Sequence, residues 1–296
     1  MSFRLEAVEQ GVDLVVTGPW SRKAEKYVQS GRADGLALNY AWGFNEPDLR
    51  FLIGLPLSRL MILDRKITDL EPISTLGNLR SLSVQTDPRA VVNLECLPKL
   101  TSLGAAWSQV RDTIGAVGPL EDLYLARYSE ADFTPLSGLS SLASLVMKDY
   151  PGVRSLDGLP SLANLQRLEV HVARQLEDIR ALRETVYPHL ERLHFSHAKR
   201  VVDLEALEGL QQLRMLEFSD GGDVTSLKPL EGLRNLEYLY LFGSTRVVDG
   251  DLRPVLGLPK LVDFRLQSRR HYTPSVAQVK EAVGNRNGPL HCTTAS

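Results

Sequence analysis

The sequence predicts an α/β solenoid, in which short strands and turns stack into a coil along one long parallel sheet. Two observations support this fold class. Within single segments such as SLKPLEGLRNLEYLYL, at residues 226–241, leucine first recurs at every third position and then at every second. This change of rhythm returns about eleven times along the chain, at intervals of 20 to 25 residues. The apolar pattern of a helix repeats about every 3.6 residues and that of a strand every 2. A segment that follows neither period throughout therefore changes backbone conformation and direction partway along.

The second half of each copy predicts a strand with one buried face. Its last two apolar residues are separated by a single residue, which is the period of a strand. The eleven pairs are Leu36/Leu38, Leu60/Ile62, Leu82/Val84, Leu103/Ala105, Leu123/Leu125, Leu145/Met147, Leu168/Val170, Leu193/Phe195, Leu216/Phe218, Leu239/Leu241 and Phe264/Leu266. No single copy can bury its leucines alone, so the copies must stack, and we expect a parallel sheet of about eleven strands.

The first half of each copy predicts a 3₁₀ or extended path. Apolar residues recur at every third position, as in ITDLEPISTL at residues 67–76, and three residues per turn fits a 3₁₀ or polyproline-like backbone better than an α-helix. Prolines recur at one place of the copy, at Pro72, Pro135, Pro229 and Pro254. One longer copy differs, because Ile179, Leu182 and Val186 have helical spacing and predict a short α-helix that Pro188 ends.

The two ends of the array need caps, which divides the chain into three parts. Residues 1–32 form the N-terminal cap, residues 33–268 the repeats, and residues 269–296 a C-terminal cap helix with a loose tail. In the N-terminal cap, DLVVTG predicts a short strand, and Ser21 caps a helix that Gly31 ends.

The C-terminal cap is predicted from the segment YTPSVAQVKEAVG. Thr273 is expected as the N-cap of a helix with Pro274 at its first position. Three valines at helical spacing then share the buried face, namely Val276, Val279 and Val283.

Composition indicates a soluble globular protein, and the net charge gives no general attraction to nucleic acid or lipid. Hydrophobic residues make up 43% and charged residues 24% of the chain, as in folded domains. The 34 Lys+Arg and 36 Asp+Glu sum to a net charge of −2, so no global field attracts nucleic acid or anionic lipid. The sequence has neither a basic segment followed by an apolar run at its start nor the ~18 apolar residues of a membrane span, which predicts a cytoplasmic protein. Cys96 and Cys292 match no disulfide framework or zinc spacing, which agrees with that compartment.

The repeat pattern resembles a known family. L-x-x-L-x-L followed by [VI]-x-x-L-x-x-L-x-x-L, seen in LRMLEFSDGGDVTSLKPLEGLRNL and LSRLMILDRKITDLEPISTLGNL, is similar to the roughly 22-residue class of leucine-rich repeat proteins. That class includes the bacterial internalins and a eukaryotic regulatory subunit of protein phosphatase 1. The resemblance covers about residues 33 to 268 and implies a leucine-rich repeat horseshoe with a concave sheet and a mostly 3₁₀ or extended convex side. It implies an interaction scaffold rather than a shared chemistry.

Two features depart from this family. Surface-anchored internalins carry a signal peptide and C-terminal modules, which this sequence lacks, so an adhesin is not expected. The family usually has asparagine three positions after the last strand leucine, where this chain has Ala41, Arg65, Asp87, Ser108, Tyr128, Tyr150, Ala173, Ala198, Gly221, Ser244 and Arg269. An asparagine there bonds free backbone groups, so irregular turns are expected without it. Trp107, Tyr128 and Tyr150 either replace the asparagine packing or extend a binding surface.

The residues beside the strand leucines point outward and form the candidate binding surface. Tyrosine and arginine anchor many protein interfaces, and large outward rings are costly to leave in water. The predicted partner-binding residues are Tyr124, Arg167, Glu169, Arg192, His194, Glu217, Tyr238, Tyr240, Phe242 and Arg265. In the alternative interpretation, the rings pack on one another or on the C-terminal cap.

This surface predicts a non-enzymatic scaffold that binds another protein through its concave face. We expect an inhibitor or immunity-type protein of a bacterium, or an adaptor, that is monomeric by itself and has no catalytic residue, metal or cofactor. No G-x-S-x-G, P-loop or G-x-G-x-x-G motif occurs between a strand and a helix, so the sequence offers no signature of catalysis.

Two other functions remain open at this stage. Adjacent strands lie ~4.8 Å apart, so Glu169, His194 and Glu217 should be neighbours in one row, with His171 nearby. Two histidines and a carboxylate can bind zinc or a catalytic iron, which allows a metal-dependent enzyme or sensor, although HFSH is no recognised metal motif and an open sheet offers no cleft. Nucleic-acid binding would use the outward arginines Arg59, Arg167, Arg192 and Arg265. Interleaved carboxylates argue against it, because phosphate binding favours an uninterrupted basic stripe.

Overall fold

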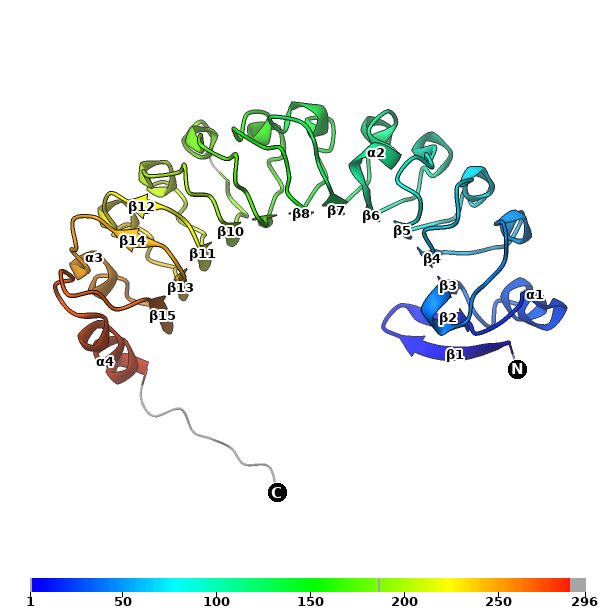
Figure 1. Cartoon of the computed structure of the whole chain (residues 1–296), viewed down its shortest axis with the longest axis horizontal. Helices are drawn as coiled ribbons and strands as arrows, with labels where there is room; N and C mark the ends of the chain where they lie inside the picture. The colour runs from blue at the N-terminus through cyan, green and yellow to red at the C-terminus, as the bar shows by residue number, and fades with distance from the viewer. Residues whose placement is uncertain (1, 186, 288–296) are drawn as a thin grey trace, which may run out of the picture. The chain divides into compact units, whose positions relative to one another are not determined.

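The computed structural model describes residues 2–185 and 187–287. The chain forms two compact units. The first comprises Met1–Tyr128 and Pro135–Leu142, and the second comprises Ser129–Thr134 and Ala143–Ser296. In both units the backbone alternates between a short strand and a turn or 3₁₀ segment (Figure 1). The predicted α/β solenoid is therefore confirmed.

The sheet of the first unit runs in the order β1 to β7. Its strands are β1 (Phe3–Val8), β2 (Gly11–Val16), β3 (Gly35–Asn39), β4 (Arg59–Leu63), β5 (Ser81–Gln85), β6 (Ser102–Ala106) and β7 (Asp122–Ala126). β1 and β2 pair antiparallel, whereas β2 to β7 pair parallel. The α-helices of this unit are α1 (Arg22–Gln29) and α2 (Trp107–Val110).

The sheet of the second unit is parallel and runs in the order β8-β9-β10-β11-β13-β15. Its strands are β8 (Ser144–Lys148), β9 (Arg167–Val170), β10 (Arg192–Ser196), β11 (Met215–Ser219), β13 (Tyr238–Leu241) and β15 (Asp263–Leu266). A second, two-stranded sheet pairs β12 (Asp223–Val224) with β14 (Arg246–Val247). The α-helices are α3 (Arg253–Leu256) and α4 (Val276–Asn287).

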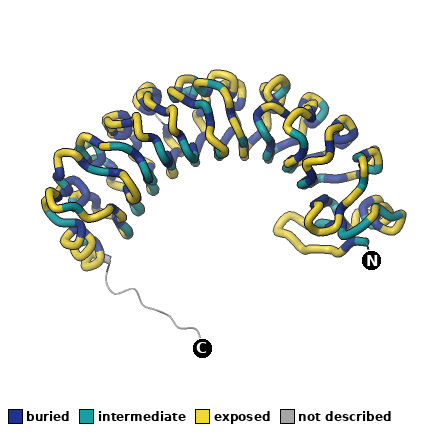
Figure 2. Tube along the Cα trace, in the orientation of Figure 1, coloured by how far each residue is buried: buried dark blue, intermediate teal, exposed yellow. Residues whose placement is uncertain are grey.

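The strand prediction is confirmed in every copy. Each of the eleven predicted apolar pairs lies in one of the strands β3 to β11, β13 and β15, and all of these side chains are buried. Neighbouring copies stack leucine on leucine, as in the register of Leu193 with Leu216 and of Leu216 with Leu239. Each copy thus buries its strand leucines against its neighbours. In strands such as β10, β11 and β13, the residue between the two buried apolar residues remains partly exposed (Figure 2). The core of each unit is this ladder of leucines.

The opposite side of the coil is largely 3₁₀, as the three-residue period predicts. The 3₁₀ helices are η1 (Tyr40–Trp42), η2 (Arg50–Leu52), η3 (Glu71–Thr75), η4 (Leu94–Cys96), η5 (Ile114–Ala116), η6 (Thr134–Leu136), η7 (Leu159–Ser161), η8 (Arg180–Arg183), η9 (Glu205–Leu207) and η10 (Lys228–Leu230). Pro72, Pro135 and Pro229 lie in η3, η6 and η10, and Pro254 lies in α3. These prolines occur in first turns, where the missing amide costs no helical hydrogen bond.

The α-helix predicted in the longer copy is wrong. Residues Arg180–Arg183 form the 3₁₀ helix η8, although Ile179 and Leu182 are buried as expected. The Tyr187 hydroxyl donates to the Ala181 carbonyl at 2.9 Å, an acceptor that an α-helix would need for the amide four residues on. Val186, the third residue of that prediction, lies outside the described residues.

The elements of the two ends are close to those predicted, with one correction. Ser21 caps α1, since its Oγ accepts from the Ala24 amide at 3.2 Å, and β2 contains the first four residues of the predicted strand DLVVTG. α4 begins at Val276, and Ser275 rather than Thr273 is its cap, because Ser275 Oγ accepts from the Gln278 amide at 3.3 Å.

Thr273 is engaged elsewhere. Its backbone amide donates to the Gly250 carbonyl at 2.8 Å, and its carbonyl accepts from the Leu252 amide at 3.0 Å, so the residue belongs to the last coil. The predicted valine face of α4 is confirmed, since Val276, Val279 and Val283 are all buried. The loose tail was predicted for NRNGPLHCTTAS, residues 285–296. Residues 285–287 instead belong to α4, and the remainder lies outside the described residues.

The turns that follow the strands are irregular, as the missing asparagine predicts. In the described part of the chain, the non-glycine residues with left-handed φ values, 49° to 60°, are Arg127, Asp149, Tyr150, Val172, His197 and Asp220. All of them follow a strand, and this conformation is uncommon outside glycine. Other side chains bond the free amides there: Ser196 Oγ accepts from the Val172 amide and Thr245 Oγ1 from the Gly221 amide, both at 3.0 Å.

Candidate functional site

The candidate site lies on the outward face of the second unit, across β9, β10, β11, β13 and β15. The strand register aligns Arg167 with Arg192, and Glu169 with His194. It then continues the second row through further neighbours, Glu217, Tyr240 and Arg265. Of the predicted residues, Tyr124 is the exception, because it lies on β7 of the first unit, where it is exposed.

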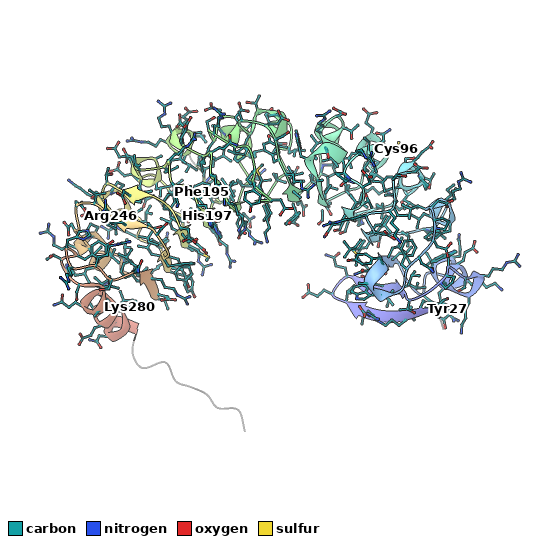
Figure 3. All side chains as sticks on the ribbon, in the orientation of Figure 1. Tyr27, Cys96, Phe195, His197, Arg246 and Lys280 are labelled. Atoms are coloured by element: carbon teal, nitrogen blue, oxygen red, sulfur yellow. The ribbon has the colours of Figure 1, made fainter. Side chains whose placement is uncertain are left out.

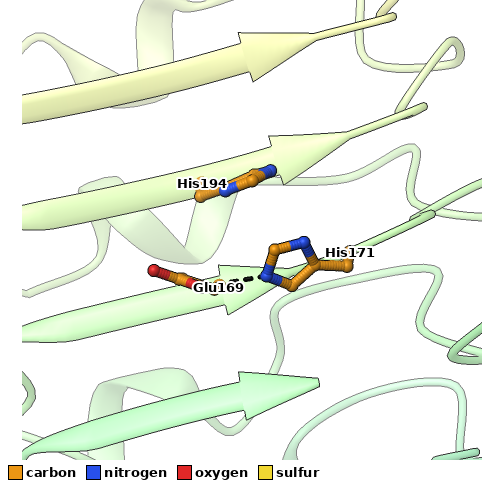
Figure 4. Close-up of side chains that lie close together, drawn as sticks. All are labelled: Glu169, His171 and His194. Atoms are coloured by element: carbon orange, nitrogen blue, oxygen red, sulfur yellow. Dashed lines mark hydrogen bonds and ion pairs between the residues drawn. The ribbon is translucent and has the colours of Figure 1, made fainter. Parts of the chain in front are cut away.

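Glu169 is the centre of a cluster of charged and imidazole groups (Figure 4). Its Oε2 accepts from His171 Nε2 at 2.9 Å, and its Oε1 accepts from Arg167 Nε at 2.7 Å. The bond from His171 and then that from Arg167 lower the pKa of Glu169 to about 2, against the opposing effect of burial. Glu169 is therefore a carboxylate with both oxygens engaged at neutral pH.

His194 packs against this cluster through the ring of His171, and one of its ring nitrogens has no hydrogen bond in the part of the chain that the structure describes. Its ring centroid is 4.3 Å from that of His171, and its Nε2 lies 3.6 Å from Glu217 Oε1, too long for a hydrogen bond. That nitrogen is buried and has no hydrogen-bond partner among the described residues. Burial lowers the pKa of His194, which favours its neutral form.

His197, the second histidine of the HFSH segment, does not join the cluster. It lies in the turn after β10, at a left-handed φ of 60° (Figure 3). Residues Glu169, His171 and His194 each offer one metal-ligand atom, and these atoms lie within 4.8 Å of one another. The part of the predicted patch that could hold a metal is thus this trio.

The aromatic cluster comprises Tyr238, Tyr240 and Phe242. Its ring centroids are 6.2 Å and 6.5 Å apart, so the rings do pack on one another. Phe242 is nevertheless 38% exposed. The Arg265 guanidinium lies 4.6 Å above the centre of the Tyr240 ring, at cation–π distance.

Asp263 fixes the arrangement of this cluster. Its Oδ2 accepts from the Tyr240 hydroxyl at 3.1 Å and from Arg265 Nε at 2.9 Å. Burial, followed by the charge and hydrogen bond of Asp263, raises the pKa of Tyr240, so its hydroxyl is a donor at neutral pH. The ring and the guanidinium are held in position by one carboxylate.

A shallow hollow of about 270 Å³ adjoins the aromatic cluster. Its lining residues are Glu191, Arg192, Arg214, Met215, Glu237, Tyr238 and Tyr240. Arg214 pairs with Glu237 at 2.9 Å and leaves Arg192 as an exposed cation at the rim. Sequence reasoning did not select Arg214 or Glu237, because they precede the strands and the two-residue alternation does not show that their side chains reach the sheet face.

Most of the arginines proposed for phosphate contacts are already paired with carboxylates. Arg59 contacts Asp13 and Asp34 at 2.8 Å and 2.9 Å. Arg167 pairs with Glu169 at 2.7 Å, and Arg265 pairs with Asp263 at 2.9 Å. Paired guanidinium groups offer little charge to phosphate, which disfavours nucleic-acid binding on this face.

The aromatic residues at the turn edge divide between two roles. Trp107 and Tyr128 are buried, and their ring centroids are 4.6 Å apart, so they pack in the place of the missing asparagines. Tyr150 is 64% exposed and has the Arg174 guanidinium 5.0 Å above its ring centre.

The chain has the leucine-rich repeat fold, with parallel strands on one side of each coil and 3₁₀ turns on the opposite side. It is similar to an internalin (InlF) from Listeria monocytogenes, with 24% identity, a TM-score of 0.67, and coverage of 88% of this chain and 74% of that one. The functional domain of InlJ from the same organism has 16% identity, a TM-score of 0.53, and 92% and 67% coverage. A leucine-rich repeat protein of Leptospira interrogans has 15% identity, a TM-score of 0.52, and 86% and 77% coverage.

These likenesses show the fold. The sequence matches no protein-family model and no curated protein. Leucine-rich repeat domains generally bind proteins and are usually non-catalytic. None of the helices within residues 2–185 and 187–287 combines the length and hydrophobicity that crossing a bilayer requires.

Proposed function

We propose that the chain is a non-enzymatic scaffold that binds another protein on the outward face of β9 to β15. The observation that supports this most is the aromatic cluster with the adjoining hollow of about 270 Å³, rimmed by the exposed Arg192. Partly exposed tyrosines beside a hollow and an exposed arginine are the composition of an interface anchor. A preformed sheet face also loses little conformational entropy when it binds.

The finer role that we propose is inhibition or recruitment of a cytoplasmic partner by a bacterial protein of the immunity or adaptor type. A rigid face of several strands can cover the working surface of an enzyme. An inhibitor should abolish the activity of its partner at a 1:1 ratio, whereas an adaptor should leave that activity intact.

The test compares the wild type with a triple variant, Arg192→Ala, Tyr238→Ala and Tyr240→Ala. Both are used to capture proteins from lysate of the source organism, with mass spectrometry as readout, and the captured protein is then purified and titrated against each variant. We expect the triple variant to weaken binding at least a hundredfold, because anchor residues dominate interface energy. The histidines are left in place.

A matched control changes the same residue types away from this face. Tyr40→Ala with Arg50→Ala alters an exposed tyrosine and an exposed arginine of the first unit, and should bind the partner as the wild type does. If the triple variant binds as tightly as the wild type, the interface lies on another surface of the protein. Failure to capture any protein would contradict the inhibitor role.

A further inference from the structure

We propose that Glu169, His171 and His194 bind a divalent transition-metal ion, with Zn²⁺ as the ion that fits best. This proposal does not depend on the protein-binding function, since it concerns a small ion and three side chains of the second unit. The three ligand atoms lie within 4.8 Å of one another. Two imidazoles and one carboxylate form a ligand set that is common for zinc.

The spacing suits an ion after small side-chain rotations. Zinc bonds of about 2.0–2.2 Å place tetrahedral ligands about 3.3–3.6 Å apart. His171 Nε2 and Glu169 Oε2 are 2.9 Å apart, so they must separate slightly, while His194 must move slightly inward. The backbone need not change, because these residues lie on or directly after the hydrogen-bonded strands β9 and β10.

The unsatisfied nitrogen of His194 is an independent observation. A buried polar atom without a partner is rare in folded proteins and costs free energy. The bond between His171 and Glu169 satisfies those two groups but leaves His194 Nε2 with none. A bound ion accounts for a feature that the ion pair alone does not explain.

Arg167 holds Glu169 as an outer-shell residue of a metal site would. Arg167 donates to Glu169 Oε1 at 2.7 Å, which holds the carboxylate and leaves Oε2 facing the histidines. Hydrogen bonds of this kind orient ligands and strengthen metal binding. Three protein ligands on an open sheet leave one coordination position for water or an added ligand.

The experiment is calorimetric titration of ZnCl₂ into the full chain, purified without a histidine tag and stripped with a chelator. We expect saturable binding of one ion per chain. His194→Ala, His171→Ala and Glu169→Gln should each weaken it more than tenfold. His189→Ala removes an exposed histidine outside the trio and should leave the affinity unchanged.

Melting temperatures measured in the presence of chelator show whether each variant is folded without metal, so that a loss of zinc binding can be distinguished from a loss of folding. Glu169→Gln keeps the size of the side chain, so it provides a folded variant even if a histidine variant is destabilised. The proposal is overturned if the wild type shows no saturable site. It is equally overturned if folded variants of the trio bind zinc as tightly as the wild type, since the zinc would then be adventitious.

Discussion

Single outward residues determine which parts of the sheet face are available to a partner. At the start of β4, Arg59 is enclosed by Asp13 and Asp34, and a Cβ on Gly35 would lie 1.8 Å from Asp13 Oδ1. A side chain at position 35 would displace Asp13 from Arg59, which accounts for the glycine that pairs with Arg59 in the sheet. The charged network is therefore an internal feature of the first unit, whereas Arg192 at the equivalent position of β10 is exposed.

The Asp34–Arg59 pair predicts a specific loss of stability in acid. Hydrogen bonds from Arg59 first, and then from the Val12 amide and Ser58, lower the pKa of Asp34 from 3.8 to about 2. A carboxyl with a lowered folded-state pKa stabilises the fold above its unfolded pKa, and this contribution is lost as the pH falls from about 3.8 to 2. Asp34→Asn should therefore destabilise the protein at pH 6 and flatten the pH dependence of its unfolding free energy in that window.

Chemical denaturation at several pH values measures this effect. Asp122→Asn, at an exposed position of β7, is the control and should keep the wild-type pH dependence. An unchanged slope for Asp34→Asn would show that the pair with Arg59 does not form in solution.

At the scale of elements, strands were predicted better than helix ends. The alternation in β10 and β11 follows from one buried face, so the sequence alone determines the register of Leu193 with Leu216. Helix ends depend on tertiary bonds: Thr273 is held by Gly250 in the last coil, which no local pattern reveals. The first strand, β1, was also missed: its sequence FRLEAV alternates apolar and polar residues, but it lies outside the repeat pattern and only Phe3 of its residues is buried.

The corrected start of α4 can be tested at its cap. Ser275 and Gln278 exchange two hydrogen bonds, of 2.9 Å and 3.3 Å, which is the geometry of a capping box. Ser275→Ala should lower the unfolding free energy by about 1 kcal/mol, because the Gln278 amide in the first turn loses its partner. Thr273→Ala should cost less, since that residue contributes backbone bonds that alanine retains. The denaturant midpoints of the two variants measure this difference. A larger effect of Thr273→Ala would show that Thr273 is the N-cap, as the sequence predicted.

At the scale of the whole molecule, the fold could be predicted because the same leucine pattern, which is ambiguous in one copy, recurs along the chain. Eleven copies of one pattern specify the solenoid, even though one leucine pair alone would be ambiguous. The site was harder, since the outward rows do not repeat. The sequence placed Glu169, His194 and Glu217 in one row, but the long contact between His194 and Glu217, the pairing of Arg265 with Asp263 and the hollow beside Tyr238 depend on side-chain conformations.

The repeat architecture also predicts which substitutions lower the unfolding free energy. Leu216 is fully buried on β11, between β10 and β13. Leu216→Ala should lower the unfolding free energy by about 2–5 kcal/mol through a cavity. Tyr240→Ala, on the outward face of β13, should cost clearly less, about 1 kcal/mol, because it loses partly exposed ring contacts and opens no buried cavity. Equal destabilisation by both variants would mean that the strand faces are reversed.

Hydrogen exchange can locate that loss. Because each copy contacts only its neighbours, stability in a repeat array is a sum of units and nearest interfaces. Leu216→Ala should therefore accelerate amide exchange most in β10, β11 and β13, and much less in β8, which does not pair with any of these three strands. A uniform acceleration across β8 to β15 would instead show that the second unit unfolds as one cooperative block, so that its stability is shared by all copies and no longer local to the mutated one.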